Sequence, residues 1–488
     1  MNENTTKTEG AKLGQKPTAK FLLKFTIPTI LSYFLMGVFG MVDQIFASRN
    51  MGVEAMASVS LVLPFLMSLI AFGSMLAMGG CALVTKKLGK NQHREARQNF
   101  SLLTIVVTVI ALAIASTTWI LRESVLTGLL GANEQILDDA LLYMEPLIIA
   151  GTVIILGIFL VQYMIANGKP ALAMIATVSG AIVSTILNII FIIVLEMGVQ
   201  GLAIATGVGY SLPAVISLVY FTFARKGSLY FVKPKWDIKA IGRAMANGTS
   251  EFITMMMIPV TKIVMNNILI NMDGIGVMGV ASAGIAMGLM NIFSALFIGF
   301  SAGMAPIVTF NHGSKKSHGM ESGAGQERRE NLRNLYKKGL VMVGALSVIA
   351  LLLTTSLASP LVSIFETRIM VDFDFLAGIP IYYDIHAMTV RGLRIISSGF
   401  LLMGINIFAT QWFTAFNDGL VSGFISLMQT AVFTVTLLLT LPKVLDLNGV
   451  WMALPLAEVL TVALSIFFLV KMGQKYHYAK PRNLLVQA

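Results

Sequence analysis

The chain has 488 residues, of which 56% are hydrophobic and 12% charged, whereas soluble domains average about 45–50% apolar and about 25% charged residues. Its apolar runs reach about 20 residues, longer than the ~10-residue alternating strands of a membrane barrel. The composition therefore excludes a soluble globular protein and predicts an all-α polytopic membrane protein.

The charge balance and the cysteine content narrow the class further. The formal net charge is +11, which in a soluble protein would suggest nucleic-acid binding. In a membrane protein the excess is explained by basic residues in cytoplasmic loops, so we expect no nucleic-acid partner. The single cysteine, Cys81, excludes an internal disulfide and a thiolate metal cluster.

Twelve apolar stretches are long enough to cross a bilayer. Residues 1–20 before them are polar and contain several lysines, and we predict that they form a disordered cytoplasmic leader. The predicted spans cover residues 21–48, 53–80, 99–121, 140–163, 171–195, 200–223, 246–271, 280–307, 338–365, 391–415, 419–441 and 450–471.

The basic residues predict the orientation in the membrane. Of the 35 lysines and arginines, 28 fall in or within four residues of the leader, the even-numbered loops and the tail, and four fall in the odd-numbered loops. Because basic residues concentrate in cytoplasmic loops, we predict a multi-pass protein of the cell inner (plasma) membrane with both termini in the cytoplasm.

The two halves of the chain carry a weak internal repeat at a fixed offset of 224 residues. Six spans per half imply two lobes related by a pseudo-two-fold axis along the membrane normal. We predict an N-lobe at 21–223, a cytoplasmic linker at 224–245, a C-lobe at 246–471 and a cytoplasmic tail at 472–488. Chance similarity is the alternative, because small residues are common in membrane helices. The repeat aligns Gly52, Ala57, Ser58, Gly79, Thr85 and Gly89 with Gly276, Ala281, Ser282, Gly303, Thr309 and Gly313.

Asp43 lies inside the first span, where a carboxylate is costly unless it faces protein or water. Phe39, Met36 and Ser32 precede it by about one, two and three turns on the same helix face. We predict that this face lines a substrate cavity and that Asp43 is the ion-coupling carboxylate, with a proton or Na⁺ as its ion. The alternative is a structural Asp43 that braces a neighbouring helix.

Span seven carries a polar stripe along one helix face. Glu251 and Lys262 lie roughly 16 Å apart along its axis, so they cannot pair with each other. We predict that the stripe lines the cavity and that Glu251 is the second ion-coupling candidate; the alternative is a surface acid near the membrane boundary. The stripe comprises Asn247, Glu251, Met255, Pro259, Lys262 and Asn266.

Other spans add single polar groups. Glu458 in span twelve is the third ion-coupling candidate. Each neutral group is either a cavity contact or a hydrogen-bonding link between helices. The neutral candidates for the cavity are Ser184 and Asn188 in span five, Asn406 in span ten and Gln429 in span eleven.

Several sites are not indicated by the sequence. There is no G-x-x-x-x-G-K-[ST] run, so we expect no bound nucleotide and no transport powered by the chain's own ATP hydrolysis. His93, His312 and His318 lie in basic loops and indicate no metal site. No His, Cys or Asp cluster has catalytic spacing, so we expect no enzymatic activity and no cofactor other than the coupling ion.

Short motifs recur in a fixed order along almost the whole chain. They are Met41-Val42-Asp43-Gln44-Ile45-Phe46, Gly89-Lys90-Asn91, Asn167-Gly168-Lys169-Pro170, Gly248-Thr249-Ser250-Glu251-Phe252, Asn311-His312-Gly313 and Leu447-Asn448-Gly449-Val450-Trp451. Their order and spacing resemble the MATE (multidrug and toxic compound extrusion) exporters, and among them the bacterial DNA-damage-inducible branch. Many members of that branch carry an acid in span five, where this chain has Asn188, which leaves Asp43 as the main titratable group of the N-lobe.

The resemblance implies twelve helices in two six-helix lobes that alternate between outward and inward openings. It implies a secondary active exporter that antiports amphipathic or cationic organic compounds and drugs against H⁺ or Na⁺, and we expect a monomer. A lipid or glycan flippase of the same superfamily, and a membrane receptor or assembly protein without transport, are the alternatives.

The predicted orientation can be tested in a variant with Cys81→Ala. Ser317→Cys lies in the basic loop after span eight, so it should resist a membrane-impermeant thiol reagent in intact cells and react in inverted vesicles. Lys443→Cys, in a predicted outer loop, is the control and should react in intact cells. Labelling of Ser317→Cys from outside would reverse the orientation.

Overall fold

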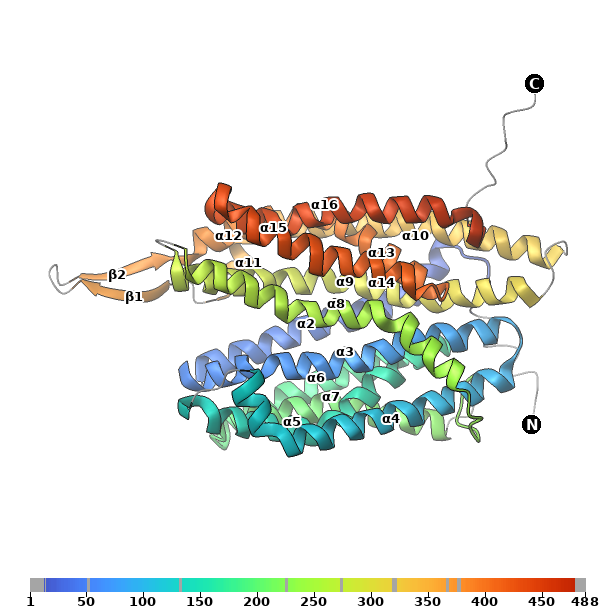
Figure 1. The fold of residues 1–488 in the computed structure, drawn as a ribbon, viewed down its shortest axis with the longest axis horizontal. Helices are drawn as coiled ribbons and strands as arrows, with labels where there is room; N and C mark the ends of the chain where they lie inside the picture. Colours follow the sequence, from blue (N-terminus) through green and yellow to red (C-terminus); the bar gives the residue numbers. More distant parts are fainter. Residues whose placement is uncertain are drawn as a thin grey trace, which may run out of the picture.

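The structure is a computed structural model that describes Leu13 and residues 15–50, 53–130, 134–223, 227–272, 275–317, 323–365, 368–374 and 379–478. Long helices lie side by side and form two lobes (Figure 1). The N-lobe contains α2 (Ala19–Asn50), α3 (Val53–Gly89), α4 (His93–Ser124), α5 (Glu134–Ala166), α6 (Pro170–Asn188) and α7 (Gly198–Phe223). The C-lobe contains α8 (Ile238–Ile270), α9 (Gly276–Ser317), α10 (Gly323–Ser356), α12 (Ile385–Ser397), α13 (Phe400–Ala415), α14 (Gly419–Leu427), α15 (Thr434–Thr440) and α16 (Pro442–Tyr476).

These helices confirm the predicted all-α membrane fold with two lobes of six spans. Eleven described helices are long and apolar enough to cross a membrane, and α12 with α13 makes the twelfth as a span bent by 51°. Span ten therefore begins at Ile385 rather than at the predicted residue 391. The break falls at Ser398 and Gly399, where a Cβ on the glycine would lie only 3.2 Å from the Pro455 Cα of α16.

The two ends of the bundle differ. α2 begins and α16 ends at one end, which we call the chain-end face, at the right of Figure 1. At the opposite end, the hairpin face, the antiparallel strands β1 (Arg368–Asp374) and β2 (Ile379–Asp384) project beyond the helices. The short helix α11 (Ala358–Val362) precedes this hairpin. The sequence analysis predicted no element there, because two short strands carry no long periodic signal.

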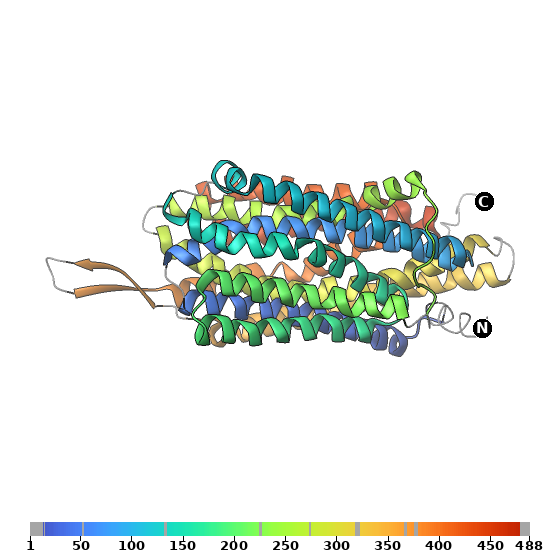
Figure 2. The same ribbon diagram turned by 90° about the horizontal axis from the view of Figure 1, so that it is seen from below.

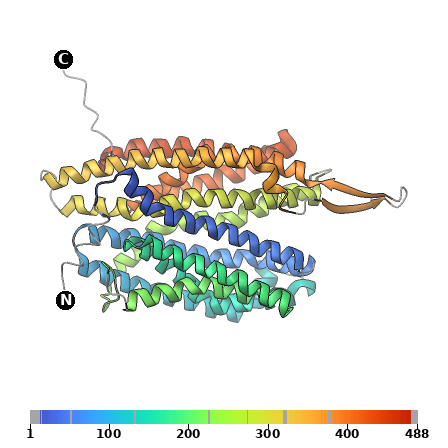
Figure 3. The same ribbon diagram turned by 180° about the vertical axis from the view of Figure 1, so that it is seen from behind.

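Helix α2 contacts both lobes. α2 begins beside the C-lobe at the chain-end face and reaches the N-lobe toward the hairpin face (Figure 3). Near its start, the Asn311 side chain donates a hydrogen bond to the Leu13 carbonyl, and Lys338 donates to the Pro17 carbonyl. The prediction of a leader that is disordered through residue 20 is therefore corrected for these described residues, since Leu13 is 2% exposed.

The lobes meet through glycines in the halves of the helices near the chain-end face. A Cβ on Gly79 of α3 would overlap the Ala244 carbonyl of α8, and one on Gly248 would overlap the Met75 carbonyl. Gly303, the repeat partner of Gly79, lies equally close to the Thr29 side chain of α2. Small residues let helix backbones approach closely in membranes, so these contacts seal the lobes together at this end.

The segment between the lobes is held on the N-lobe. The Leu229 amide donates a hydrogen bond to Asn167 (2.9 Å), and the Phe231 ring stacks on Phe100 at 5.1 Å between centroids. Figure 2 shows this segment running across the chain-end face of the N-lobe. Asp237 then caps α8, which begins at Ile238, so the predicted linker of 224–245 is too long at its C-terminal end.

The predicted tail at 472–488 also begins too early. α16 continues to Tyr476, and His477 ends it in the left-handed conformation with φ of 62°. The Tyr478 hydroxyl then donates a hydrogen bond to the Leu469 carbonyl (2.7 Å) and packs its ring on Trp412 and Tyr336. The first residues of the tail therefore belong to the C-lobe core.

The glycine contact predicts a position-specific effect on stability. Gly248→Ala should lower the melting temperature in detergent, because the added methyl group must displace the Met75 backbone, at a cost of roughly 1–3 kcal/mol. Gly242→Ala on the same helix is the matched control: nothing lies within 4 Å of its Cβ position, so it should leave the melting temperature unchanged or raise it. Equal effects of both variants would contradict the packing described here.

Candidate functional site

Among the candidate carboxylates whose side chains the structure describes, the most enclosed is Glu458, on α16 in the interior of the C-lobe. It is 7% exposed. Asn406 Nδ2 of α13 donates to Glu458 Oε2 (2.7 Å), and Gln429 Nε2 donates to both carboxylate oxygens (3.0 and 3.1 Å). Ser465 Oγ in turn donates to Asn406 Oδ1 (2.9 Å). The structure thus brings together three predicted site residues from three different spans.

The second predicted carboxylate of the C-lobe, Glu251, lies between the lobes. Gln411 Nε2 of α13 donates a hydrogen bond to Glu251 Oε2 (2.8 Å). The Tyr33 phenol of α2 lies near enough to interact electrostatically with Glu251, and the neighbouring Phe252 packs on Phe72 of α3 at 5.0 Å between centroids. Glu251 is therefore half-buried among groups from both lobes, and its role as an ion-coupling acid stays a prediction.

One helix, α13, serves both carboxylates. Its Asn406 binds Glu458 on one side and its Gln411 binds Glu251 on the other. Five residues separate the two amides, or about 7.5 Å along the helix axis. Gln411 was not among the predicted site residues, and only its position beside the lobe interface distinguishes it from other neutral groups.

The polar stripe of α8 becomes more exposed toward the hairpin face. Asn247 is buried at 3% and donates to the Thr414 carbonyl (3.0 Å). Glu251, Met255 and Lys262 are half-buried, and Asn266 is exposed. The stripe therefore leaves the sealed part of the lobe interface and opens toward the hairpin face, as a cavity wall would.

The predicted N-lobe face is only partly described. Ser32 is buried and accepts a hydrogen bond from Thr177 of α6 (3.2 Å), while Met36 and Phe39 are half-buried. The Asp43 side chain lies outside the described residues, although α2 continues through that position. Its prediction as the coupling carboxylate, and that of Na⁺ beside it, are therefore not tested.

The remaining N-lobe candidates lie on α6. Ser184 is 7% exposed and packs against Gly209 of α7, and Asn188 is fully buried at the end of α6. This burial between helices is as consistent with a packing role for both residues as with a place in a cavity wall. The structure does not bring either residue to Ser32 by any contact that it describes.

Both lobes carry a π-helical segment in their fifth span, which the sequence analysis did not predict. In the N-lobe, η2 (Ile189–Val194) begins directly after Asn188. In the C-lobe, η3 (Met428–Phe433) contains Gln429, whose carbonyl accepts a hydrogen bond from Thr434 Oγ1 (2.7 Å). A π-segment adds a residue to a turn and often marks a functional site, and here it turns Gln429 toward Glu458.

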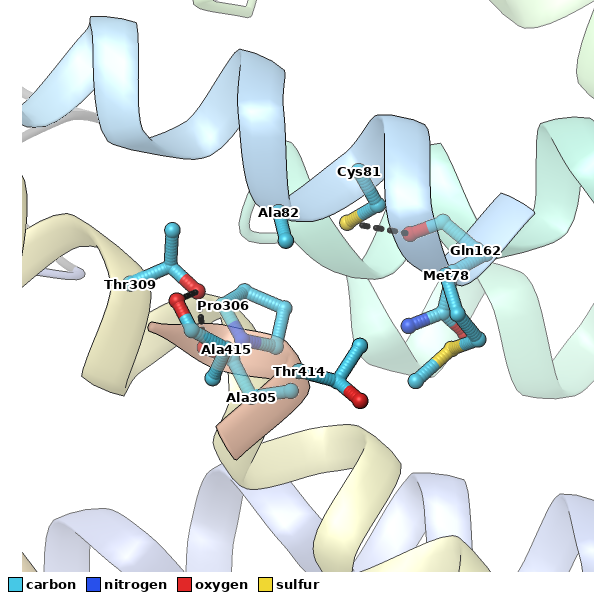
Figure 4. Close-up of a pocket in the computed structure, with 9 residues that line it drawn as sticks. All are labelled: Met78, Cys81, Ala82, Gln162, Ala305, Pro306, Thr309, Thr414 and Ala415. Carbon is cyan, nitrogen blue, oxygen red and sulfur yellow. Dashed lines mark hydrogen bonds between the residues drawn. The ribbon is translucent and has the colours of Figure 1, made fainter. Parts of the chain in front are cut away.

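A small cavity lies between the lobes, in the part of the interface near the chain-end face (Figure 4). Its volume is about 10 Å³, which is near the minimum for one water and far below the ~300–1,000 Å³ of a drug-sized site. Gln162 and Thr414 contribute polar groups to its wall. The cavity is therefore part of the seal. Its lining residues are Met78, Cys81, Ala82, Gln162, Ala305, Pro306, Thr309, Thr414 and Ala415.

Within the described part of the chain, no three His, Cys, Asp or Glu side chains are grouped so that they could hold a metal ion. The buried carboxylates instead have amide partners. Such groups can exchange a proton or face a monovalent cation.

Comparisons with known proteins agree with this architecture. The MatE family model matches residues 28–190. The chain is 23% identical over 451 residues to the multidrug export protein MepA of Staphylococcus haemolyticus (strain JCSC1435), covering 92% of both chains. It is 20% identical over 469 residues to MepA of Staphylococcus aureus (strain MSSA476), covering 94% of this chain and 95% of that one.

Solved structures show the same fold. A crystal structure of MATE in complex with MaL6 superposes with a TM-score of 0.85 at 17% identity and covers 96% of this chain and 99% of that one. An outward-facing multidrug resistance MATE transporter of the MOP superfamily gives a TM-score of 0.84 at 17% identity, with 96% and 98% covered.

The fold is thus a multi-pass membrane fold of twelve spans, built of two lobes around a pseudo-two-fold axis. More particularly, it is the MATE fold, and residues 28–190 carry the MatE domain. The predicted resemblance is confirmed, whereas the DNA-damage-inducible branch within the family stays a prediction.

The exposure gradient along α8 predicts a role for Lys262. Lys262→Met should change the relative export of cationic and neutral dyes while the protein still accumulates in the membrane, because the variant removes a charge from the predicted cavity wall. The matched control is Ile263→Met on the adjacent, exposed apolar face, which should change neither. Dye accumulation in cells measures both, and unchanged export by Lys262→Met would show that this lysine does not line the path.

Proposed function

We propose that the protein is a secondary active multidrug exporter that works by alternating access. The observation that carries this proposal is the asymmetry of the lobe interface. Glycine contacts close it near the chain-end face, while the polar stripe on α8 becomes exposed toward the hairpin face. A path open to one side and closed to the other is one of the two states that alternating access requires. The names of the MepA relatives support drugs as substrates.

The orientation proposed for this exporter places the chain-end face in the cytoplasm. The large excess of basic residues on that side supports this orientation. The state described above would then be open to the outside and closed to the cytoplasm. Substrate would enter from the cytoplasm in the opposite state and leave here.

The coupling ion, H⁺ or Na⁺, is proposed to act on the acids near the lobe interface. Gln411 of α13 binds Glu251, and the Tyr33 phenol of α2 interacts with it electrostatically, so the charge of Glu251 is felt by both lobes. Neutralising it would change the cost of burying this interface, which is how an ion can favour one state over the other. Asp43 remains the proposed N-lobe counterpart, and the protein is expected to act as a monomer.

A flippase for lipids or glycans is less well supported. Such a cavity would need several cations for anionic head groups, whereas Lys262 is the single cation on the described polar stripe of α8. A receptor without transport would not restore drug resistance. Expression in a host that lacks its own pumps, followed by growth on a panel of cationic dyes, separates these functions, and unrestored resistance to every compound would overturn the proposal.

Coupling can be tested in vesicles with an imposed ion gradient. Asp43→Asn and Glu251→Gln should each reduce gradient-driven export at least about tenfold while dye binding remains detectable, because each variant removes one exchangeable charge. Glu145→Gln is the control: this acid pairs with Arg122 at 2.9 Å and is about one-third exposed, so its loss should leave export nearly unchanged. Normal export by either of the first two variants would remove that acid from the mechanism.

Asn188→Asp tests the missing acid of span five. The variant should keep transport and move its pH optimum upward, since two nearby carboxylates hold a proton more tightly than one. The pH profile of dye export measures the shift. An unchanged profile would mean that position 188 does not lie close to the N-lobe carboxylate.

A further inference from the structure

We propose that Glu458, held by Asn406 and Gln429 inside the C-lobe, is a second proton-binding site, separate from the acids at the lobe interface. This inference rests on the proposed ion-coupled export. Glu458 is 7% exposed, and both oxygens of its carboxylate accept hydrogen bonds from side-chain amides. A carboxylate this enclosed persists only because these donors replace water.

The orientation of the amides favours a proton over Na⁺. The nitrogens of Asn406 and Gln429 face the carboxylate, and Asn406 Oδ1 is already occupied by the Ser465 hydroxyl. A sodium ion would need several oxygen ligands around it, so both amides would have to reverse. A proton needs one carboxylate oxygen alone, and the amides can stay in place.

No charged side chain in the described structure contacts the Glu458 carboxylate. The elements that pack against its helix, α16, include α8, α12, α13, α14, α15 and η3, and of these six α8 and α12 carry charged or titratable side chains. On α12, Arg391 and Arg394 are exposed, and that helix meets α16 at Trp451, about 10 Å along the axis from Glu458. On α8, Glu251 is bound to Gln411, and Lys262 is half-buried. The remaining groups of these helices are His386 on α12 and Lys239 and Arg243 on α8.

Protonation of Glu458 would change its hydrogen bonds to the fifth span of the C-lobe. Gln429 donates to both oxygens of Glu458 and lies in η3, the π-segment between α14 and α15. Adding a proton weakens these charge-assisted bonds. At the other end of α14, a Cβ on Gly419 would overlap the backbone of Asn247, so α14 packs directly on α8. A change in the π-segment would therefore reach the helix that carries Glu251.

The experiment is a pH titration of the purified full-length protein by infrared difference spectroscopy, without any substrate. The wild type should show the carbonyl band of a protonated carboxylic acid that grows as the pH falls. Glu458→Gln should lose one component of that band, the contribution of Glu458, and Glu251→Gln should retain that component. Because no drug is present, this result does not depend on whether the protein exports drugs.

A second pair of variants keeps the test valid if Glu458→Gln does not fold. Gln429→Leu removes the donor to both oxygens of Glu458, so the midpoint of this component should move to higher pH by at least about one pH unit. Gln411→Leu is the matched control, since Gln411 binds Glu251 instead, and it should leave this midpoint unchanged. A band from which Glu458→Gln removes no component, or a component whose midpoint Gln429→Leu does not move, would overturn the proposal.

Replacing choline by Na⁺ at constant ionic strength tests the identity of the ion. The midpoint should be the same in both salts if the proton alone binds. A midpoint that falls as Na⁺ rises would show that Na⁺ competes for the carboxylate, and it would overturn the assignment to a proton.

Discussion

The close approach of α3 and α8 is the contact on which the rest of the arrangement depends. At Gly79 and Gly248 the two backbones touch without intervening side chains, and Gly303 provides the related contact of α9 with α2. Apolar side chains gain little by leaving lipid for a lobe interface, so close packing must provide the attraction there. This packing places Glu251 between the lobes and leaves the far half of α8 exposed. The positions of these glycines therefore determine both the burial of Glu251 and the exposure of the far half of α8.

Much of this architecture was predictable, because the bilayer restricts the alternatives. Apolar length gave the twelve spans, and the cost of polar groups in lipid singled out Glu458, Asn406 and Gln429. Periodicity along one helix could not show that these three meet, since that depends on how α13, η3 and α16 pack. For the same reason the sequence did not reveal the role of Gln411. It did not reveal the π-segment either, because none of the residues Met428–Phe433 favours a π-helix on its own. The β1–β2 hairpin was missed because it projects beyond the long helices, where apolar length and periodicity give no signal.

The two lobes share a fold but differ in charge. Each lobe has a π-segment in its fifth span. In each lobe an aromatic residue that follows the sixth span also packs on rings of the lobe core, Phe231 in the N-lobe and Tyr478 in the C-lobe. At the π-segments, however, the N-lobe has the neutral Asn188, whereas the C-lobe has an amide bound to Glu458. The two lobes therefore share this packing, while among the side chains that the structure describes a buried acid lies beside the π-segment of the C-lobe.

The way in which the linker is held also limits how far the lobes can move. Val232 is bound to Ser101 of the N-lobe, and Asp237 already caps the first helix of the C-lobe. Five residue steps separate these anchors, and a fully extended chain covers roughly 3.3–3.6 Å per residue, or about 17 Å in all. The linker is thus a short tether at the edge of the interface, and it permits rotation more readily than separation. An opening at the chain-end face would have to be a tilt about this tether, with the widest gap on the opposite side of the bundle.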